Sequence, residues 1–148
     1  MRWILIAAMA ALACATEAAA APLEGIAMEA AATVDAFHAA LHRGDTTAAA
    51  ALIADDALVF ESGEAERTKA EYAAHHLAAD AAFSKTVGTT TSRRFGGGEG
   101  NLAWIATEGR STGTYKGRAI DSATTETMLL RRTPEGWRIV HVHWSSSH

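Results

Sequence analysis

The chain has 148 residues, of which 49% are hydrophobic and 20% charged, and its formal net charge is −4. This length suits one domain of ordinary size and is too short for two. The mild acidity, with basic residues only in short pairs such as Arg93-Arg94 and Arg131-Arg132, argues against a nucleic-acid partner, which requires a basic surface.

Residues 1–21 are typical of a signal peptide. A positive start at Met1-Arg2 precedes an apolar run over residues 3–15, and residues 18–21 supply the small side chains of a cleavage site. A permanent membrane helix needs roughly 20 apolar residues, whereas this run stops at Thr16. The sequence therefore predicts an exported protein, periplasmic or secreted, without a stable membrane span.

Cys14 is the only cysteine and lies inside that segment. Residues 11–14 partly match a bacterial lipoprotein box, so a lipid anchor on Cys14 is the alternative to simple removal of the segment. In either case residues 22–148 form a single domain without a thiol. This excludes a cysteine nucleophile, a cysteine zinc site and an intrachain disulfide.

Helical patterns come first in the mature chain. Residues 23–43 carry apolar side chains at three- and four-residue spacing, and Gly44 is placed to end that helix. Asp45 is placed to cap a short second helix over residues 46–53.

A short strand and a third helix follow. Residues 57–61 alternate as a strand does, and Ser62-Gly63 turns the chain. Thr68 begins the third helix, where Glu71 completes a capping box. This helix carries four polar residues that suit a site: Tyr72, His75, His76 and Asp80.

The rest of the chain reads as an antiparallel meander. Alternating patterns predict strands over residues 87–95, 102–115, 118–132 and 137–145. The glycine-rich residues 96–101 are expected to form a flexible turn. Helices followed by strands indicate an α+β fold, in which a curved antiparallel sheet wraps around N-terminal helices and leaves a half-open cone with one pocket.

Three segments carry a family resemblance: residues 34–45 (a helix end followed by Gly-Asp), residues 52–60 (leading into the first strand) and the final strand, G-W-R-I-V-H-V-H-W-S. Over residues 26–147 the chain resembles the nuclear transport factor 2-like (SnoaL-like, cystatin-like cone) superfamily. It looks most similar to an exported branch described as a domain of unknown function.

The resemblance implies a pocket between the concave sheet face and the helices. The superfamily hosts isomerases, dehydratases, polyketide cyclases, transport adaptors and oligomerisation modules, and fold does not select among them. The chain lacks an obvious tyrosine–aspartate pair like that of the steroid isomerase members, so the resemblance does not by itself imply their chemistry.

The last hairpin carries the candidate site. If residues 133–136 form its turn, Glu126 lies opposite His143 and Met128 lies opposite His141. Strand alternation places both histidines on one face, which we expect to look toward the helices. A carboxylate beside a histidine would favour the imidazolium or fix the tautomer. A slip of one residue would send Glu126 to the other face.

Three interpretations of these histidines stay open. They are structural residues satisfied by hydrogen bonds, or they line a ligand pocket with Glu126 and His143 as an acid–base pair. The third is a metal site, for which the candidate ligands are His76, Asp80, His141 and His143. No cofactor is predicted.

The sequence thus predicts an exported cone domain that binds a small, partly apolar molecule, and leaves open whether it is an enzyme. The residues expected to line the pocket beside Glu126 and His143 are Tyr72, His76, Trp104, Met128, Trp137 and His141. One alternative is an isomerase, cyclase or dehydratase that uses Glu126 and His143. Another is a homodimer formed through the face away from the histidines, where we expect Leu129, Val140 and Val142.

Overall fold

The computed structural model describes residues 23–147, so the predicted signal peptide over residues 1–21 and its Cys14 lie outside the described residues. None of the helices within residues 23–147 is long and apolar enough to span a membrane. The elements are, in order, α1 (Gly25–Arg43), α2 (Thr46–Ala51), β1 (Ile53–Glu61), β2 (Glu64–Glu66), α3 (Lys69–His75), α4 (Leu77–Ser84), β3 (Val87–Glu99), β4 (Leu102–Tyr115), β5 (Arg118–Thr133) and β6 (Gly136–Ser146).

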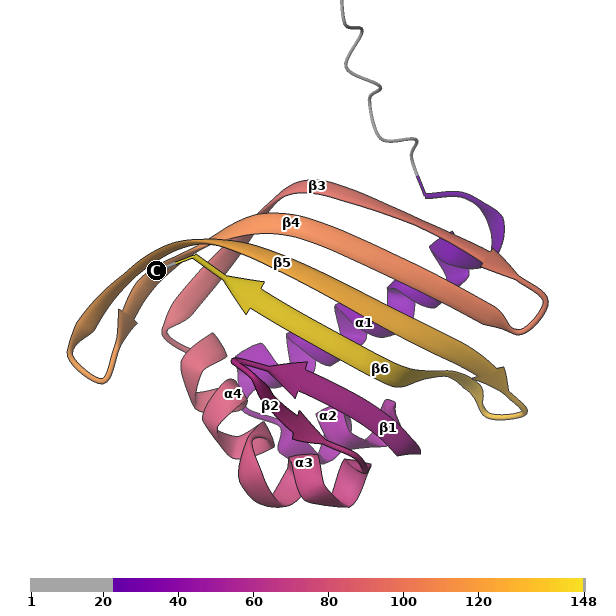
Figure 1. Ribbon diagram of the computed structural model, residues 1–148, viewed down its shortest axis with the longest axis horizontal. Helices are drawn as coiled ribbons and strands as arrows, with labels where there is room; N and C mark the ends of the chain where they lie inside the picture. The colour runs from indigo at the N-terminus through magenta and orange to yellow at the C-terminus, as the bar shows by residue number, and fades with distance from the viewer. Residues whose placement is uncertain (1–22, 148) are drawn as a thin grey trace, which may run out of the picture.

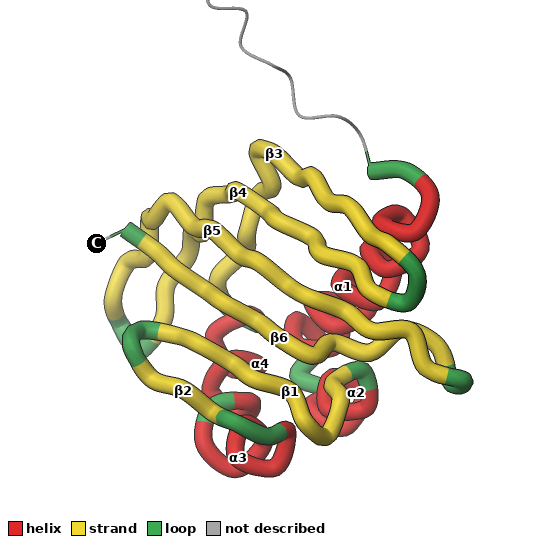
Figure 2. The backbone as a smooth tube through the Cα atoms, turned by 45° about the vertical axis from the view of Figure 1, so that its right-hand side comes forward, coloured by secondary structure: helices red, strands yellow, loops and turns green. Residues whose placement is uncertain are grey.

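The six strands form one curved, open sheet in the order β2-β1-β6-β5-β4-β3 (Figure 1). Neighbouring strands are antiparallel except β1 and β6, which are parallel. The long strands β3, β4 and β5 arch over α1, while α2, α3 and α4 gather at the β1 side of the sheet (Figure 2). The predicted α+β cone is confirmed.

Small side chains allow α1 to lie close to the sheet. Its buried face is mostly alanine, and the few larger side chains fill the space between helix and strands: Val34, Phe37 and Leu41. The sheet contributes a fully or nearly fully buried apolar set: Ala103, Ile105, Met128, Leu130, Ile139 and Val142. This layer is the core that fixes the sheet on the helix.

The glycines of β3 belong to the same packing. A Cβ added at Gly96 would lie 2.9 Å from Cδ1 of Ile105, and one added at Gly98 would lie 2.6 Å from Cγ2 of Ile26 on α1. The predicted flexible turn over residues 96–101 is therefore wrong for residues 96–99, and the chain turns at Gly100-Asn101. The strand runs on to Glu99, because glycine is what allows β3 and α1 to approach each other here.

The predicted helix caps are confirmed. Gly44 ends α1 in the left-handed conformation, with φ of 73°. The Asp45 side chain accepts from the Ala48 amide at 2.9 Å, and the Thr68 hydroxyl accepts from the Glu71 amide at 3.1 Å. Each cap satisfies an amide that a helix start leaves without a partner.

The bounds of the shorter helices differ from the prediction in two places. The second helix stops at Ala51, so β1 begins earlier than predicted, at Ile53. The predicted third helix is two helices, α3 and α4, which meet at His76 with φ of −111°. The break coincides with contacts from the His76 ring to carboxylates on β2.

A β-bulge in β6 decides which of its side chains face the helices. Pairing begins as predicted, with Leu130 opposite Ile139. The next pair is Leu129 with His141, so Val140 is an extra residue in β6. All later side chains of β6 are thereby exchanged between the two faces.

The predicted pairs Glu126–His143 and Met128–His141 are consequently wrong. Glu126 lies opposite Trp144, and Met128 lies opposite Val142. The turn over residues 133–136 was predicted correctly. Alternation of side chains does not reveal where a bulge changes the phase of a strand, so the sequence did not indicate the bulge at Val140.

Candidate functional site

Four side chains from four adjacent strands lie in one row across the concave face. Arg94 on β3 pairs with Thr107 on β4, Thr107 with Glu126 on β5, and Glu126 with Trp144 on β6. We call these four residues the inner row. The row faces α1, since Arg94 and Glu126 both bond to side chains of that helix.

Glu126 is the buried centre of the inner row. Only 10% of its side chain is exposed, and its Oε2 accepts hydrogen bonds from Trp144 Nε1 at 2.7 Å and from His38 Nε2 at 2.8 Å. Burial raises the pKa of this carboxyl, but the hydrogen bonds from His38 and Trp144 and the charge of Arg94 outweigh it, so the pKa lies below its usual range. Glu126 is therefore an anchored carboxylate at neutral pH.

The other oxygen of that carboxylate is free. Glu126 Oε1 is buried and has no hydrogen-bond partner within residues 23–147. A fixed carboxylate with one oxygen unused is the arrangement that a general base or a ligand acceptor needs.

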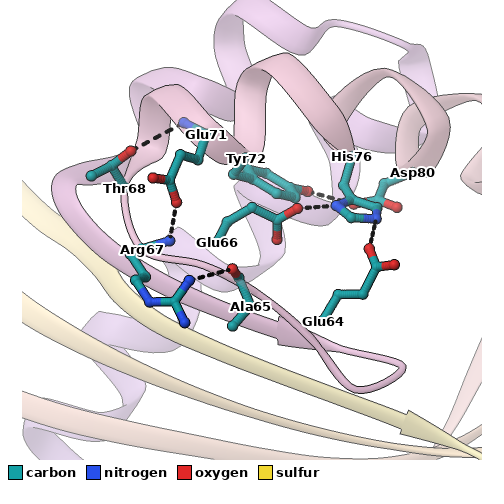
Figure 3. Close-up of polar contacts among 9 residues, drawn as sticks. All are labelled: Glu64, Ala65, Glu66, Arg67, Thr68, Glu71, Tyr72, His76 and Asp80. Carbon is teal, nitrogen blue, oxygen red and sulfur yellow. Dashed lines mark hydrogen bonds and ion pairs between the residues drawn. The ribbon is translucent and has the colours of Figure 1, made fainter.

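A second group of polar side chains, the acidic cluster, lies where α3 packs on β1 and β2 and joins α4 (Figure 3). Its members are Glu61, Glu64, Glu66, Tyr72, His76 and Asp80.

Two contacts hold the acidic cluster together. The Tyr72 hydroxyl donates to Oδ2 of Asp80 at 2.7 Å. His76 bonds through Nδ1 to Glu66, and its Nε2 lies 3.2 Å from a Glu64 oxygen (Figure 3). Carboxylates at both ring nitrogens favour the imidazolium, and the hydrogen bond that the ring donates to Glu66 raises the pKa of His76.

Three groups of the acidic cluster, Glu61, Asp80 and Tyr72, have raised pKa values. Burial, reinforced by the negative charge of Asp80, raises the pKa of Glu61 to about 7. Burial likewise raises the pKa of Asp80 and of Tyr72, so the phenol stays a proton donor. Glu61 is thus an acid that changes its charge close to neutral pH.

The inner row and the acidic cluster meet at Trp144. Glu61 pairs with Trp144 on one side, and Glu126 pairs with it on the other. The ring of Trp144 stacks on Phe37 at 6.3 Å between centroids and lies 6.4 Å from the ring of Tyr72. One indole therefore separates an ionised carboxylate, Glu126, from Glu61, an acid whose pKa is raised to about 7.

The remaining predicted site residues lie elsewhere. Met128 is fully buried and Trp137 is 8% exposed, so both are core residues. Trp104 is 42% exposed and projects from the outer, convex face of the sheet. His141 and His143 lie on that outer face as well, opposite Leu129 and Thr127.

The two outer histidines have structural surroundings. His141 Nδ1 donates to the Leu58 carbonyl at 2.9 Å, and Phe60 makes edge contacts with both imidazole rings. The predicted contact between Glu126 and these histidines is wrong, because the bulge at Val140 turns them away from the helices.

The metal alternative is not assembled either. Within residues 23–147 no three side chains of histidine, cysteine, aspartate or glutamate are grouped to hold a metal ion. His76 and Asp80 lie in the helical layer, on the other side of the sheet from His141 and His143.

The faces predicted for a dimer also need correction. Leu129 shares the outer face with His141, its direct partner, whereas Val142 is fully buried on the concave face. The outer face is therefore both the histidine face and the face with exposed apolar side chains.

Sequence reasoning missed two features. The first is His38, which lies four residues after Val34 and so borders the apolar stripe of α1. The second is a tyrosine–aspartate contact, in which Tyr72 donates to Asp80. Eight residues of straight helix span about 12 Å, and the break at His76 brings the pair together.

A separate hollow of about 350 Å³ lies between α2 and the α3–α4 pair. It contains no ionisable side chain, so we assign the chemistry to the inner row. The hollow is lined by Thr46, Thr47, Ala50, Ala73, Leu77 and Ala78.

Comparison with known proteins agrees with this architecture. The sequence profile of the SnoaL-like domain matches residues 30–147. The chain belongs to that family. Among curated proteins, none matches it significantly.

Solved structures with the same fold extend this result. A proposed ketosteroid isomerase from Shewanella frigidimarina is 37% identical, with a TM-score of 0.75 over 79% of this chain and 94% of the other. A proposed dehydratase of the NTF2-like family from Streptomyces avermitilis is 19% identical, with a TM-score of 0.71 over 82% and 96%. An NTF2-like protein with a cystatin-like fold from Novosphingobium aromaticivorans is 19% identical, with a TM-score of 0.65 over 79% of each chain.

Proposed function

We propose that this protein binds a small, partly apolar molecule against the concave sheet face and moves a proton on it, as an isomerase, cyclase or dehydratase does. The observation that carries the proposal is Glu126, a buried and ionised carboxylate with one anchored oxygen and one free oxygen. The Shewanella protein, named as a proposed ketosteroid isomerase, supports acid–base chemistry of this kind.

Glu126 acts as the base in this proposal. Its Oε1 takes a proton from the bound molecule, while Trp144 and His38 hold the carboxylate in place through Oε2. His38, rather than the predicted His143, is therefore the histidine that bonds to Glu126. The partly exposed ring of Trp144, backed by the buried Phe37, supplies the apolar contact that a hydrophobic molecule needs.

The acidic cluster supplies the returning proton. Glu61 titrates near neutral pH and flanks the same indole as Glu126. A base and an acid with separated pKa values are what a proton-transfer enzyme requires.

The test is proton exchange on ketones. The protein is incubated in deuterium oxide with a β,γ-unsaturated ketosteroid and with simpler aryl ketones; deuterium uptake is followed by mass spectrometry, and conjugation of the steroid by its ultraviolet absorbance. We expect Glu126→Gln to slow exchange by about 100-fold or more. Glu108→Gln, on the outer face of β4, is the matched control and should leave the rate unchanged. Equal rates for both variants, or no exchange by the wild-type protein, would refute the proposal.

A second proposal concerns the outer face of the sheet, which we expect to pair with another copy of this chain. Three large apolar side chains on that face are unusually exposed, Leu102 at 52%, Trp104 at 42% and Leu129 at 40%. Leu129→Lys should convert a dimer to a monomer in sedimentation equilibrium, whereas Thr125→Lys, at an exposed polar position of the same strand and face, should not. A wild-type monomer at high concentration would refute it.

We also propose that the protein is exported, periplasmic or secreted, on the signal-like residues 1–21. Mass spectrometry of the mature protein from its own cells should show cleavage close to Pro22. A lipid on Cys14 would instead give an anchored form, and an intact N-terminus in the cytoplasm would refute export.

A further inference from the structure

We infer that the inner row is a recognition subsite for a neutral hydroxy ketone, whose carbonyl oxygen accepts from Arg94 and whose hydroxyl donates to Glu126, with Thr107 between them. This inference rests on the proposed function and deepens it by naming a substrate class.

Unused hydrogen-bonding atoms are its first support. Of the side chains within residues 23–147, four have a buried nitrogen or oxygen without a partner: Arg94 Nε, Thr107 Oγ1, Glu126 Oε1 and Trp137 Nε1. The first three belong to consecutive members of the inner row, on three adjacent strands. Buried polar atoms are almost always paired, so three unpaired atoms side by side mark a place where hydrogen-bonding capacity is kept for another molecule.

The same side chains are held in position by their other atoms. Arg94 donates through Nη1 to Asp35 on α1 at 2.6 Å, and Glu126 accepts through Oε2 from Trp144 and His38. The unpaired atoms are therefore preorganised rather than free to turn toward water. Trp137, by contrast, lies near the start of β6, away from the row, and its lone indole nitrogen has no such neighbours.

The order of donors and acceptors selects the ligand. Arg94 Nε is a donor only, the Thr107 hydroxyl is both, and Glu126 Oε1 in an ionised carboxylate is an acceptor only. Neighbouring strands are about 4.8 Å apart, so the three side chains lie close together. A ligand that contacts all of them must therefore present an acceptor to Arg94 and a donor to Glu126. Charge excludes the simpler ions, because Glu126 repels an anion and Arg94 repels a cation.

The row lies near solvent at two points. At one of them the His38 side chain, which bonds to Glu126, is 45% exposed. Beyond the row the concave face continues with small, partly exposed residues, Gly109 on β4 and Thr124 on β5.

The experiment uses three matched probes. 4-Hydroxy-4-phenylbutan-2-one has both groups, 4-phenylbutan-2-one lacks the hydroxyl, and 1-phenylbutan-1-ol lacks the carbonyl. Binding to the full mature protein is followed through the Trp144 indole N–H resonance, because that group donates to Glu126. We expect the hydroxy ketone to bind at least about tenfold more tightly than either analogue.

Two variants and their outer-face controls locate the effect. Arg94→Lys keeps a cation for Asp35 but removes the Nε donor, so it should abolish the preference for the carbonyl. Thr107→Val should weaken binding of the hydroxy ketone about tenfold. Arg93→Lys and Thr112→Val lie on the opposite face of the same strands and should change nothing.

The outcomes separate this inference from the proposed function. Equal affinity for the three probes, no shift of the Trp144 resonance, or equal effects of Arg93→Lys and Arg94→Lys would overturn the inference. If exchange on ketones still depends on Glu126 in that case, only the hydroxy ketone specificity falls. If the probes are discriminated through Arg94 but no exchange occurs, the subsite stands and the proton-transfer function falls.

Discussion

Both faces of β6 carry aromatic side chains with a ring N–H, but Trp144 on the concave face is packed and hydrogen-bonded, whereas His143 on the convex face is exposed. On the concave face Trp144 stacks on Phe37 and holds the buried carboxylate of Glu126. On the convex face the exposed His143 lies near the edge of Phe60 and the ring of His141. The chemistry available to the protein therefore depends on which face each residue occupies, and a polar residue becomes a site only where burial and fixed partners surround it.

A single extra residue decides that assignment. Alternation tells which residues of a strand share a face, but not where a strand changes phase. Because Val140 is bulged, Val142 and Trp144 turn inward and the two histidines turn outward. Two kinds of change test this difference between the faces. Single-residue deletions in β6 test how the bulge sets it, and substitutions of single residues on either face should measure it.

The largest effect is expected from two single-residue deletions. Without Val140, His141 follows Ile139 directly, and the existing pairs of Leu129 and Met128 are kept. Without Val142, any register of β6 brings a histidine to the fully buried position that Val142 occupied. We expect deletion of Val142 to cost more than about 4 kcal/mol and deletion of Val140 about 1–3 kcal/mol. Urea unfolding measures both, and equal losses would contradict the role given to the bulge.

The next effect compares neighbours on opposite faces. Trp144→Ala removes the stacked contact with Phe37 and a donor to Glu126, so we expect a loss of about 3 kcal/mol in the free energy of unfolding. His143→Ala removes an exposed ring and should change it by less than about 0.5 kcal/mol. Chemical denaturation followed by circular dichroism avoids the loss of the Trp144 fluorescence signal. A larger loss for His143→Ala would mean that the inward side chains are misassigned.

The third effect appears in the pH dependence of stability. Glu61 has a pKa raised from 4.5 to about 7 in the folded protein, first by burial and then by the charge of Asp80. The folded state thus binds this proton more tightly, so the stabilising contribution is complete below pH 4.5 and is lost as the pH rises through 7. Solvent screening reduces the full effect of such a shift on a partly exposed carboxyl, so Glu61→Gln should remove about 2–3 kcal/mol of this dependence.

The control for that titration is a carboxylate without burial. Glu99→Gln, at the exposed end of β3, should leave the curve of unfolding free energy against pH unchanged. The raised pKa of His76 gives a dependence of the same sign, which persists in both variants. If Glu61→Gln and wild-type curves run parallel between pH 4.5 and 7, Glu61 does not hold a proton near neutrality.

The fold was readable from the sequence because its signals are local. Caps at Gly44, Asp45 and Thr68, and the order of helices and strands, follow from short patterns that the structure confirms. The inner row was not readable in the same way, because its four members come from four strands and meet only if every register is right. Glu126 alone was found as an inward-facing carboxylate, and its partners were not.

The smallest effect tests the tyrosine–aspartate pair that the broken helix creates. Tyr72→Phe removes the only donor shown for Asp80, so a largely buried carboxyl loses its hydrogen bond, at a cost of about 1–3 kcal/mol. Tyr115→Phe is the matched control, because its ring packs on Phe83 at the end of β4, away from the acidic cluster. Since the Tyr72 hydrogen bond lowers the pKa of Asp80 against the effect of burial, its loss should raise that pKa further in a carboxyl NMR titration. A stability loss without a change in the Asp80 titration would show that Tyr72 serves only as a core residue. Glu61 would then be the one acid of the acidic cluster proposed to return the proton.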